Sequence, residues 1–343
     1  MKKYLKNGFF ILLIVISIIL FNYTRLIISY LVHKHEYVDS IPVYGNCNNY
    51  VPQGVTYSKK YNVVLQTSYN SKHTISMLYV IDYNSGKLLK ELKLKEFDLS
   101  DNTSHVGGIA TNEEKVWITS DFLVFEYDLN QIIHTKEKYI QSTNQSKLPI
   151  RGDFCTFHDN SLWIGDFFLN PFYKVKDNNP LLMKYPLDSL DYYKPELIIS
   201  LPKMVQGLVI TNDNKFIFTE SFTNLVHSNL SIYDNVLNEK SEMVIFYDRE
   251  IPYYKFSDKV LIKNIKLPPM AEGLFYKDKK IYILFESSSN TYFYAYPKLD
   301  YIIAYDIKKY IKWKKYYGSF HNTFFELYFN YFLNYHFLLL YEF

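Results

Sequence analysis

The chain contains one short motif twice, as "LPKMVQGL" at residues 201–208 and as "LPPMAEGL" at residues 267–274. Leu, Pro, Met, a Gln or Glu, Gly and Leu recur in the same order in both copies. A motif that returns after 66 residues indicates an internal structural repeat. The rest of the chain can be aligned on the residue that follows the Gln or Glu.

This alignment yields five units, each of which begins with a short apolar run and continues through polar turns. The units begin at "QGVTY" (53–57), "GGIAT" (107–111), "GDFCT" (152–156), "QGLVI" (206–210) and "EGLFY" (272–276). Each start is followed by a β-rich run and by a third run that often ends in Tyr-Asp, and most units add a fourth run. Four short strands at this period predict a β-propeller, because one such sheet cannot bury both of its faces alone.

We therefore predict an all-β fold, a single β-propeller of five visible four-stranded blades over residues 35–313. The last unit lacks a fourth strand after residues 302–309, and residues 36–43 are predicted to supply it and close the ring. The segment 241–258 is interpreted as an insertion, with a sixth blade as the alternative. An irregular β-sandwich remains the alternative fold.

The N-terminus carries a targeting or anchoring segment. Three lysines precede an apolar stretch from Phe9 to Val32, which Asn22–Arg25 interrupts. The stretch is long enough to span a bilayer, and the lysines favour a cytoplasmic N-terminus. We predict that residues 1–34 are an uncleaved signal anchor or transmembrane segment that leaves the body outside the cytoplasm. A cleaved signal peptide and a buried core helix are the alternatives.

Other features of the chain leave more than one interpretation. Cys47 and Cys155 could form a disulfide in an oxidising compartment or remain two free thiols. The aromatic C-terminal tail, residues 314–343, could pack on the propeller, lie at a membrane surface or pair with a partner protein. The formal net charge is +3 with both signs mixed along the chain, so we expect no nucleic-acid partner.

The strand openings carry a family resemblance. "PQGV" (52–55), "HVGGIA" (105–110), "QGL" (206–208) and "EGL" (272–274) resemble openings in the SMP-30/gluconolactonase, strictosidine-synthase-like and NHL-type propellers. That resemblance implies mostly six blades and, in some members, a metal-dependent lactonase in which the Glu of an "EG" opening ligates the metal. Glu272 matches this Glu, whereas Gln53 and Gln206 hold the equivalent place in other units.

A second periodic feature is a set of carboxylates thirteen residues after the register position. These are Asp121, Asp166, Glu220 and Glu286, with Thr67 in the first unit. The second strand of a blade returns antiparallel beside the first, so its end lies close to the start of the first strand. The candidate ligand-binding residues on that face are Gln53, His105, Arg151, Asp166, Gln206, Glu220, Glu272 and Glu286. The carboxylates either cap the strand ends or converge on a ligand at the channel mouth.

Two of these residues give the best candidate pair for a cation. Glu272 and Glu286 belong to the same blade, and carboxylate oxygens are the ligands that Ca²⁺ prefers, so Ca²⁺ is the candidate cofactor. His105 aligns with Met204 and Met270 and is predicted to be a loop or packing residue. No catalytic residue can be assigned from the sequence.

The predicted function is that of a membrane-anchored, extracytoplasmic propeller that binds a small polar ligand or a protein partner at its channel mouth. A metal-dependent lactonase-like hydrolase and a structural assembly subunit are the two alternatives. The sequence leaves open which ligand is bound and whether the protein is an enzyme.

Overall fold

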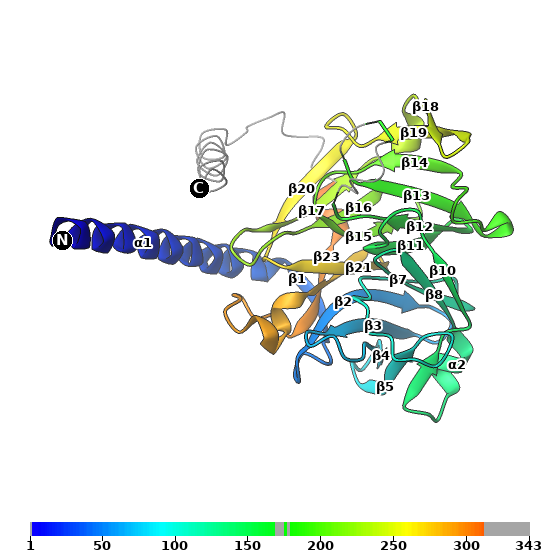
Figure 1. Cartoon of the computed structure of the whole chain (residues 1–343), viewed down its shortest axis with the longest axis horizontal. Helices are drawn as coiled ribbons and strands as arrows, with labels where there is room; N and C mark the ends of the chain where they lie inside the picture. The colour runs from blue at the N-terminus through cyan, green and yellow to red at the C-terminus, as the bar shows by residue number, and fades with distance from the viewer. Residues whose placement is uncertain (1, 169–174, 177–178, 312–343) are drawn as a thin grey trace. The chain divides into compact units, whose positions relative to one another are not determined.

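The strands of the computed structural model form five sheets, and the model describes residues 2–168, 175–176 and 179–311. Figure 1 follows these sheets in chain order from blue to orange. Blade one contains β2 (Tyr50–Ser58), β3 (Val63–Asn70), β4 (Met77–Asp82) and β5 (Leu88–Lys95). Blade two contains β6 (Gly108–Thr111), β7 (Lys115–Ser120), β8 (Leu123–Asp128) and β10 (Asn144–Lys147). Neighbouring strands within both blades are antiparallel.

The other three blades repeat this antiparallel arrangement. Blade three contains β11 (Phe154–His158), β12 (Ser161–Gly165), β13 (Leu181–Pro186) and β14 (Leu197–Ser200). Blade four contains β15 (Val205–Ile210), β16 (Phe216–Glu220), β17 (Ser228–Tyr233) and β20 (Leu261–Leu267). Blade five contains β21 (Ala271–Lys277), β22 (Lys280–Phe285), β23 (Tyr301–Asp306) and β1 (Tyr37–Pro42). The chain is therefore a five-bladed β-propeller.

The ring closes between the two ends of the propeller, as predicted. β1 pairs antiparallel with β23, with Ile41 opposite Ile302, so residues from the start of the domain complete the last blade (Figure 1). The predicted insertion is also confirmed, because β18 (Glu242–Phe246) and β19 (Arg249–Lys255) form a hairpin that extends blade three alongside β14. In that extension β19 runs parallel to β14. A short strand, β9 (Tyr139–Gln141), likewise runs parallel to β5 and extends blade one.

Short helices connect several of the strands. They are α2 (Leu129–His134), α3 (Ile307–Ile311) and the 3₁₀ turns η1 (Lys34–Glu36), η2 (Leu187–Ser189), η3 (Val236–Asn238), η4 (Glu286–Ser288) and η5 (Asn290–Tyr292). The last two lie between β22 and β23, and η4 begins at the candidate residue Glu286.

The glycines of the repeated motif lie where the innermost strands of neighbouring blades come closest. A Cβ atom on Gly54 would lie 2.8 Å from the carbonyl oxygen of Gly107 in the next blade. A Cβ atom on Gly273 would lie equally close, at 2.8 Å, to the carbonyl oxygen of Gln53. Both distances are shorter than side chains tolerate, so the repeated Gly is required by backbone packing between blades.

The blades pack on one another through apolar and aromatic faces, which accounts for the aromatic-rich composition. Ring contacts between neighbouring blades include Trp117 with Phe157, stacked with centroids 5.8 Å apart, and Trp163 with Phe216, edge to face at 5.7 Å. Such pairs add to the stabilisation gained from the burial of apolar area.

The N-terminal segment is one continuous helix, α1 (Lys2–His33). The helix continues through Asn22–Arg25, the polar residues that interrupt the apolar stretch, and there Asn22 donates to the Ile18 carbonyl at 3.2 Å and Thr24 donates to the Leu20 carbonyl at 2.9 Å. These bonds to the preceding turn satisfy the polar side chains within the helix. The segment Ile11–Ile28 is long and apolar enough to cross a membrane, and signal sequences share this length and composition.

Two further sequence expectations concern the cysteines and the tail. Both cysteines are free: Cys47 is exposed and Cys155 is buried, so no disulfide joins them. Burial raises the pKa of the Cys155 thiol to about 12. The tail at 314–343 lies outside the described residues.

Candidate functional site

The two best candidate carboxylates lie at the same end of blade five. Glu272 follows the first residue of β21, and Glu286 follows the last residue of β22, the antiparallel neighbour of β21. The backbone N–H of Glu286 donates to the carbonyl of Met270 at 3.0 Å. Met270 has a left-handed φ of 65°, and this bond ties the end of the second strand to the residues that precede the first. The repeated Leu-Pro-x-Met turn thus brings Glu286 next to the backbone that carries Glu272.

Blade one contributes the third member of this centre. The Gln53 side chain is buried, and its Nε2 donates to the Glu286 carboxylate and to the Pro52 carbonyl. The loop after Glu286 also rests on blade one, because Ser289 Oγ donates to the Tyr50 carbonyl at 2.7 Å. The centre therefore lies across the junction at which the last blade meets the first.

The electrostatics of this centre are unfavourable for two charged carboxylates. Glu272 is only 4% exposed, and its side chain has no hydrogen bond to any of the described residues. Burial raises the pKa of Glu272 well above its ordinary value, and the negative charges of Glu286 and Asp153 add to this rise. Burial also raises the pKa of Glu286 to about 7, against the opposing effect of the Gln53 hydrogen bond. Near neutral pH the pair therefore holds at least one proton.

Aromatic side chains form a wall beside the acid pair. Tyr69 of β3 and Tyr292 of η5 bring their hydroxyl oxygens to 3.2 Å from each other. Burial is the main cause of the raised pKa of each phenol, to about 12 for Tyr69, and the charges of Glu272 and Glu286 contribute to both. The two tyrosines therefore lie within electrostatic reach of both carboxyl groups.

His105 extends this wall. Its ring stacks on Tyr69, with centroids 4.3 Å apart and planes tilted by 30°. The side chain is exposed to solvent. The protein around it nevertheless removes part of the water that would stabilise a charged imidazole, and this desolvation lowers the pKa of His105 to about 4. The imidazole is consequently neutral at physiological pH. The prediction that His105 is a loop or packing residue agrees with this position before β6.

Arg151 belongs to a polar group in blades two and three, and the charge of Asp153 in this group also acts on Glu272. Its guanidinium contacts Asp153 at 3.0 Å and Asp121 at 3.3 Å. Asp166 is buried and accepts a hydrogen bond from the N–H of Leu181, the first residue of β13. Burial raises the pKa of Asp166 well above its ordinary value. In this blade the acid caps a neighbouring strand, which is the structural role that the sequence left open.

The remaining predicted residues lie in blade four. Glu220 faces Asn229 and Ser231 of the adjacent strand, with the charge of Lys266 nearby, and burial raises its pKa. Gln206 is half-buried at the start of β15. Neither residue contacts the acid pair through a hydrogen bond. The structure thus brings together Gln53, Glu272 and Glu286, with His105 beside them, and places Arg151, Asp166 and Glu220 in other local networks.

Sequence reasoning missed Tyr69 and Tyr292. Tyr69 lies two residues after Thr67 and Tyr292 lies six residues after Glu286, and these two residues belong to the thirteen-residue position. The chain has 35 tyrosines, and nothing in the sequence distinguishes Tyr69 and Tyr292 from the others.

A metal ion was the candidate cofactor, and the donor set does not match it. Within residues 2–168, 175–176 and 179–311, no group of three or more His, Cys, Asp or Glu side chains is arranged to hold a metal. Glu272 and Glu286 supply two carboxyl groups, whereas Ca²⁺ takes six to eight oxygen ligands. The aromatic rings beside the pair supply no further carboxylate.

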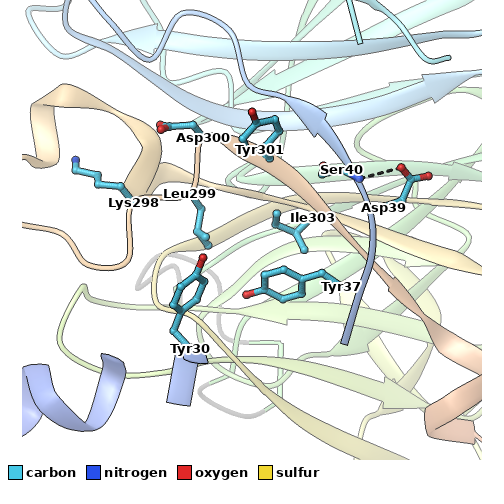
Figure 2. A pocket seen from close by; sticks show the side chains of 9 residues that line it. All are labelled: Tyr30, Tyr37, Asp39, Ser40, Lys298, Leu299, Asp300, Tyr301 and Ile303. Carbon is cyan, nitrogen blue, oxygen red and sulfur yellow. Dashed lines mark hydrogen bonds between the residues drawn. The ribbon is translucent and has the colours of Figure 1, made fainter. Parts of the chain in front are cut away.

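A hollow of about 420 Å³ lies at the β1 edge of blade five (Figure 2). It is lined by Tyr30, Tyr37, Asp39, Ser40, Lys298, Leu299, Asp300, Tyr301 and Ile303. Its charged groups already have partners: Asp39 accepts from Lys280 and Tyr282, and Lys298 donates to two backbone carbonyls. The acid pair is therefore the stronger candidate site.

Comparisons with known proteins bear on the fold alone. No family model matches the chain, and no curated protein matches it. Among solved structures, the glutaminyl cyclase of Myxococcus xanthus is 8% identical, with 79% of this chain and 94% of that chain covered and a TM-score of 0.46. The PQQ-bound aldose sugar dehydrogenase from Streptomyces coelicolor is 11% identical, with 73% and 77% covered and a TM-score of 0.39. Membership of the SMP-30-type families stays a prediction.

Proposed function

We propose that this protein is a membrane-anchored propeller whose body lies outside the cytoplasm and binds a small polar ligand at the channel mouth. The observation that carries the binding proposal is the Glu272 carboxyl, which is 4% exposed and has no hydrogen-bond partner among the described residues. A buried polar group without a partner costs folding free energy. A ligand that hydrogen-bonds to Glu272 or neutralises it recovers that free energy.

A thermal-shift screen of the full chain in maltoside micelles tests this proposal. The screen contains sugars, polyols, amines, organic acids and Ca²⁺. A ligand at one hundred times its dissociation constant stabilises the folded state by about 2.7 kcal/mol. We expect at least one class to raise the melting temperature of the wild type and to leave Glu272→Gln unchanged. If every class acts equally on both proteins, the mouth is not a ligand site.

The topology is tested separately. Alkaline phosphatase fused after residue 343 folds only outside the cytoplasm, so we expect an active fusion that fractionates with the membrane. A fluorescent reporter that folds in the cytoplasm serves as the reciprocal control. An inactive phosphatase with a fluorescent control would reverse the proposed orientation, and an active fusion in the soluble fraction would indicate a cleaved signal peptide.

One observation favours an enzyme as the second candidate. Glu286 has a pKa of about 7 and lies beside a second carboxyl, that of Glu272, whose pKa burial also raises well above its ordinary value. Two carboxyl groups that differ in protonation near neutral pH are suited to general acid and general base catalysis. A hydrolase of this kind would lose turnover in Glu286→Gln while it kept ligand affinity, whereas a binding protein would show no turnover of the ligand that it stabilises.

A further inference from the structure

We infer that the ligand of this site is an organic ammonium ion, held by Glu272 and Glu286 against the rings of Tyr69, Tyr292 and His105. This inference rests on the proposed function and specifies its ligand class. It also accounts for the mismatch between the site and a metal ion.

The first argument is the missing counter-charge. Two carboxyl groups meet here, and neither forms an ion pair with a lysine or arginine of the described residues. Two cations are engaged elsewhere, since Arg151 pairs with Asp121 and Asp153, and Lys298 donates to the Ser289 and Tyr292 carbonyls. Buried carboxylates are stable when a cation pairs with them. The protein does not supply that cation, so the ligand is expected to do so.

The second argument is the chemistry of the wall. The hydroxyl groups of Tyr69 and Tyr292 point at each other at 3.2 Å, so each already has a polar partner. The aromatic groups therefore offer ring carbon atoms in place of free polar atoms, and His105, which stacks on one face of Tyr69, adds its own ring to the group. The faces of aromatic rings attract cations, and cages of such rings recognise alkylated ammonium groups. A neutral sugar would find few free hydrogen-bonding groups on this wall.

The third argument is the depth of the Glu272 carboxyl group. Glu272 is 4% exposed, while Glu286 and His105 are reached by solvent. A strongly hydrated metal ion would have to shed water for only two carboxyl groups. An ammonium ion with alkyl substituents carries its charge within an apolar shell, so it can approach Glu272 past the tyrosine rings at a smaller dehydration cost.

The test uses choline and its neutral carbon isostere, 3,3-dimethylbutan-1-ol, in calorimetric titrations of the full chain in maltoside micelles. We expect choline to bind and the alcohol, which has the same shape without the charge, to bind at least tenfold more weakly. Ca²⁺ is titrated as the third probe. Equal affinity for choline and the alcohol, or binding of Ca²⁺ alone, would overturn the inference.

Variants locate the binding. Glu272→Gln should lower choline affinity at least tenfold, and Tyr69→Leu should lower it about fivefold, because the ring contribution is lost. Tyr69→Phe keeps the ring and should stay within about twofold of the wild type. Glu220→Gln, at the same position of blade four as Glu286 occupies in blade five, is the matched control and should bind as the wild type does. Thermal melting of each variant establishes that it is folded.

The outcomes separate this inference from the proposed function. If a neutral polyol or Ca²⁺ binds in a Glu272-dependent manner and choline does not, the ligand class is wrong and the site stands. If no probe in this titration or in the earlier screen depends on Glu272, both proposals fail. If choline binds to Glu272→Gln and to Tyr69→Leu as tightly as it binds to the wild type, its site is elsewhere and the inference fails.

Discussion

The acid pair predicts that the protein loses stability as the pH rises, and that Glu286→Gln removes the part of this loss that Glu286 contributes. Glu286 has an ordinary pKa of 4.5, which burial raises to about 7 in the folded protein. Between these values the folded state holds a proton that the unfolded state has released. Stability therefore falls as the pH rises from 4.5 through 7. Above pH 7 the carboxylate is charged in both states, and the loss is complete.

The size of the effect follows from the same values. The rise of the Glu286 pKa from 4.5 to about 7 corresponds to about 3 kcal/mol. Glu286→Gln keeps an acceptor for the Gln53 amide and cannot ionise. We expect the variant to match the wild type at pH 5 and to exceed it by up to about 3 kcal/mol at pH 8, or about 6 °C in melting temperature.

The assay is thermal unfolding at pH 5 and pH 8, followed by the fluorescence of the buried residues Trp117 and Trp163. Glu91→Gln, which removes an exposed carboxyl on β5, is the control for a change in net charge and should stay within about 0.5 kcal/mol of the wild type at both pH values. A gap between Glu286→Gln and the wild type that is the same at both pH values would refute the reasoning. A loss of stability in the variant at pH 8 would identify Glu286 as a structural acceptor.

Three further outcomes test the fold. Ile41→Ala in the closing strand should lower the free energy of unfolding by about 2–4 kcal/mol in denaturant melts, whereas Val38→Ala, exposed on the same strand, should change it little. Gly54→Ala should destabilise the domain by about 1–3 kcal/mol or more in the same assay, because the added Cβ meets the backbone of the next blade. A charged maleimide should label Cys47 in the folded protein, and mass spectrometry should find Cys155 labelled only after unfolding.

The propeller could be predicted from the sequence because close packing of the backbone between blades requires glycine at the same position of most repeats. The innermost strands approach so closely that Gly54 and Gly273 have no room for a Cβ atom, and this constraint recurs at most of the blade junctions. The closing strand was predicted for the complementary reason, since an unpaired sheet edge needs a partner. The fourth strand of blade two, β10, carries the polar sequence "NQSK" and gave no apolar signal.

The site was only partly predictable, because spacing along the chain fixes backbone position and leaves side-chain direction open. The thirteen-residue spacing placed Glu286 beside the start of its own blade, and the structure has it there. The tyrosine pair comes from two different blades, and the contact between Tyr69 and Tyr292 depends on how the η5 turn folds over blade one. No periodic pattern encodes such a contact.

The same register position has four different environments, and this difference is the best guide to function. Asp121 is exposed and pairs with Arg151, Asp166 caps β13, and Glu220 faces polar groups of its own blade near Lys266. A structural role accounts for Asp121 and Asp166, whereas one carboxyl oxygen of Glu220 is buried without a hydrogen bond to the described residues. Glu286 instead faces a second buried carboxyl, Glu272, and its one side-chain partner is an amide from another blade. If strand capping were the whole reason for the repeated acids, this blade would follow the others. It departs from them where the ring closes, and the ligand proposed above would account for the two buried carboxyl groups there.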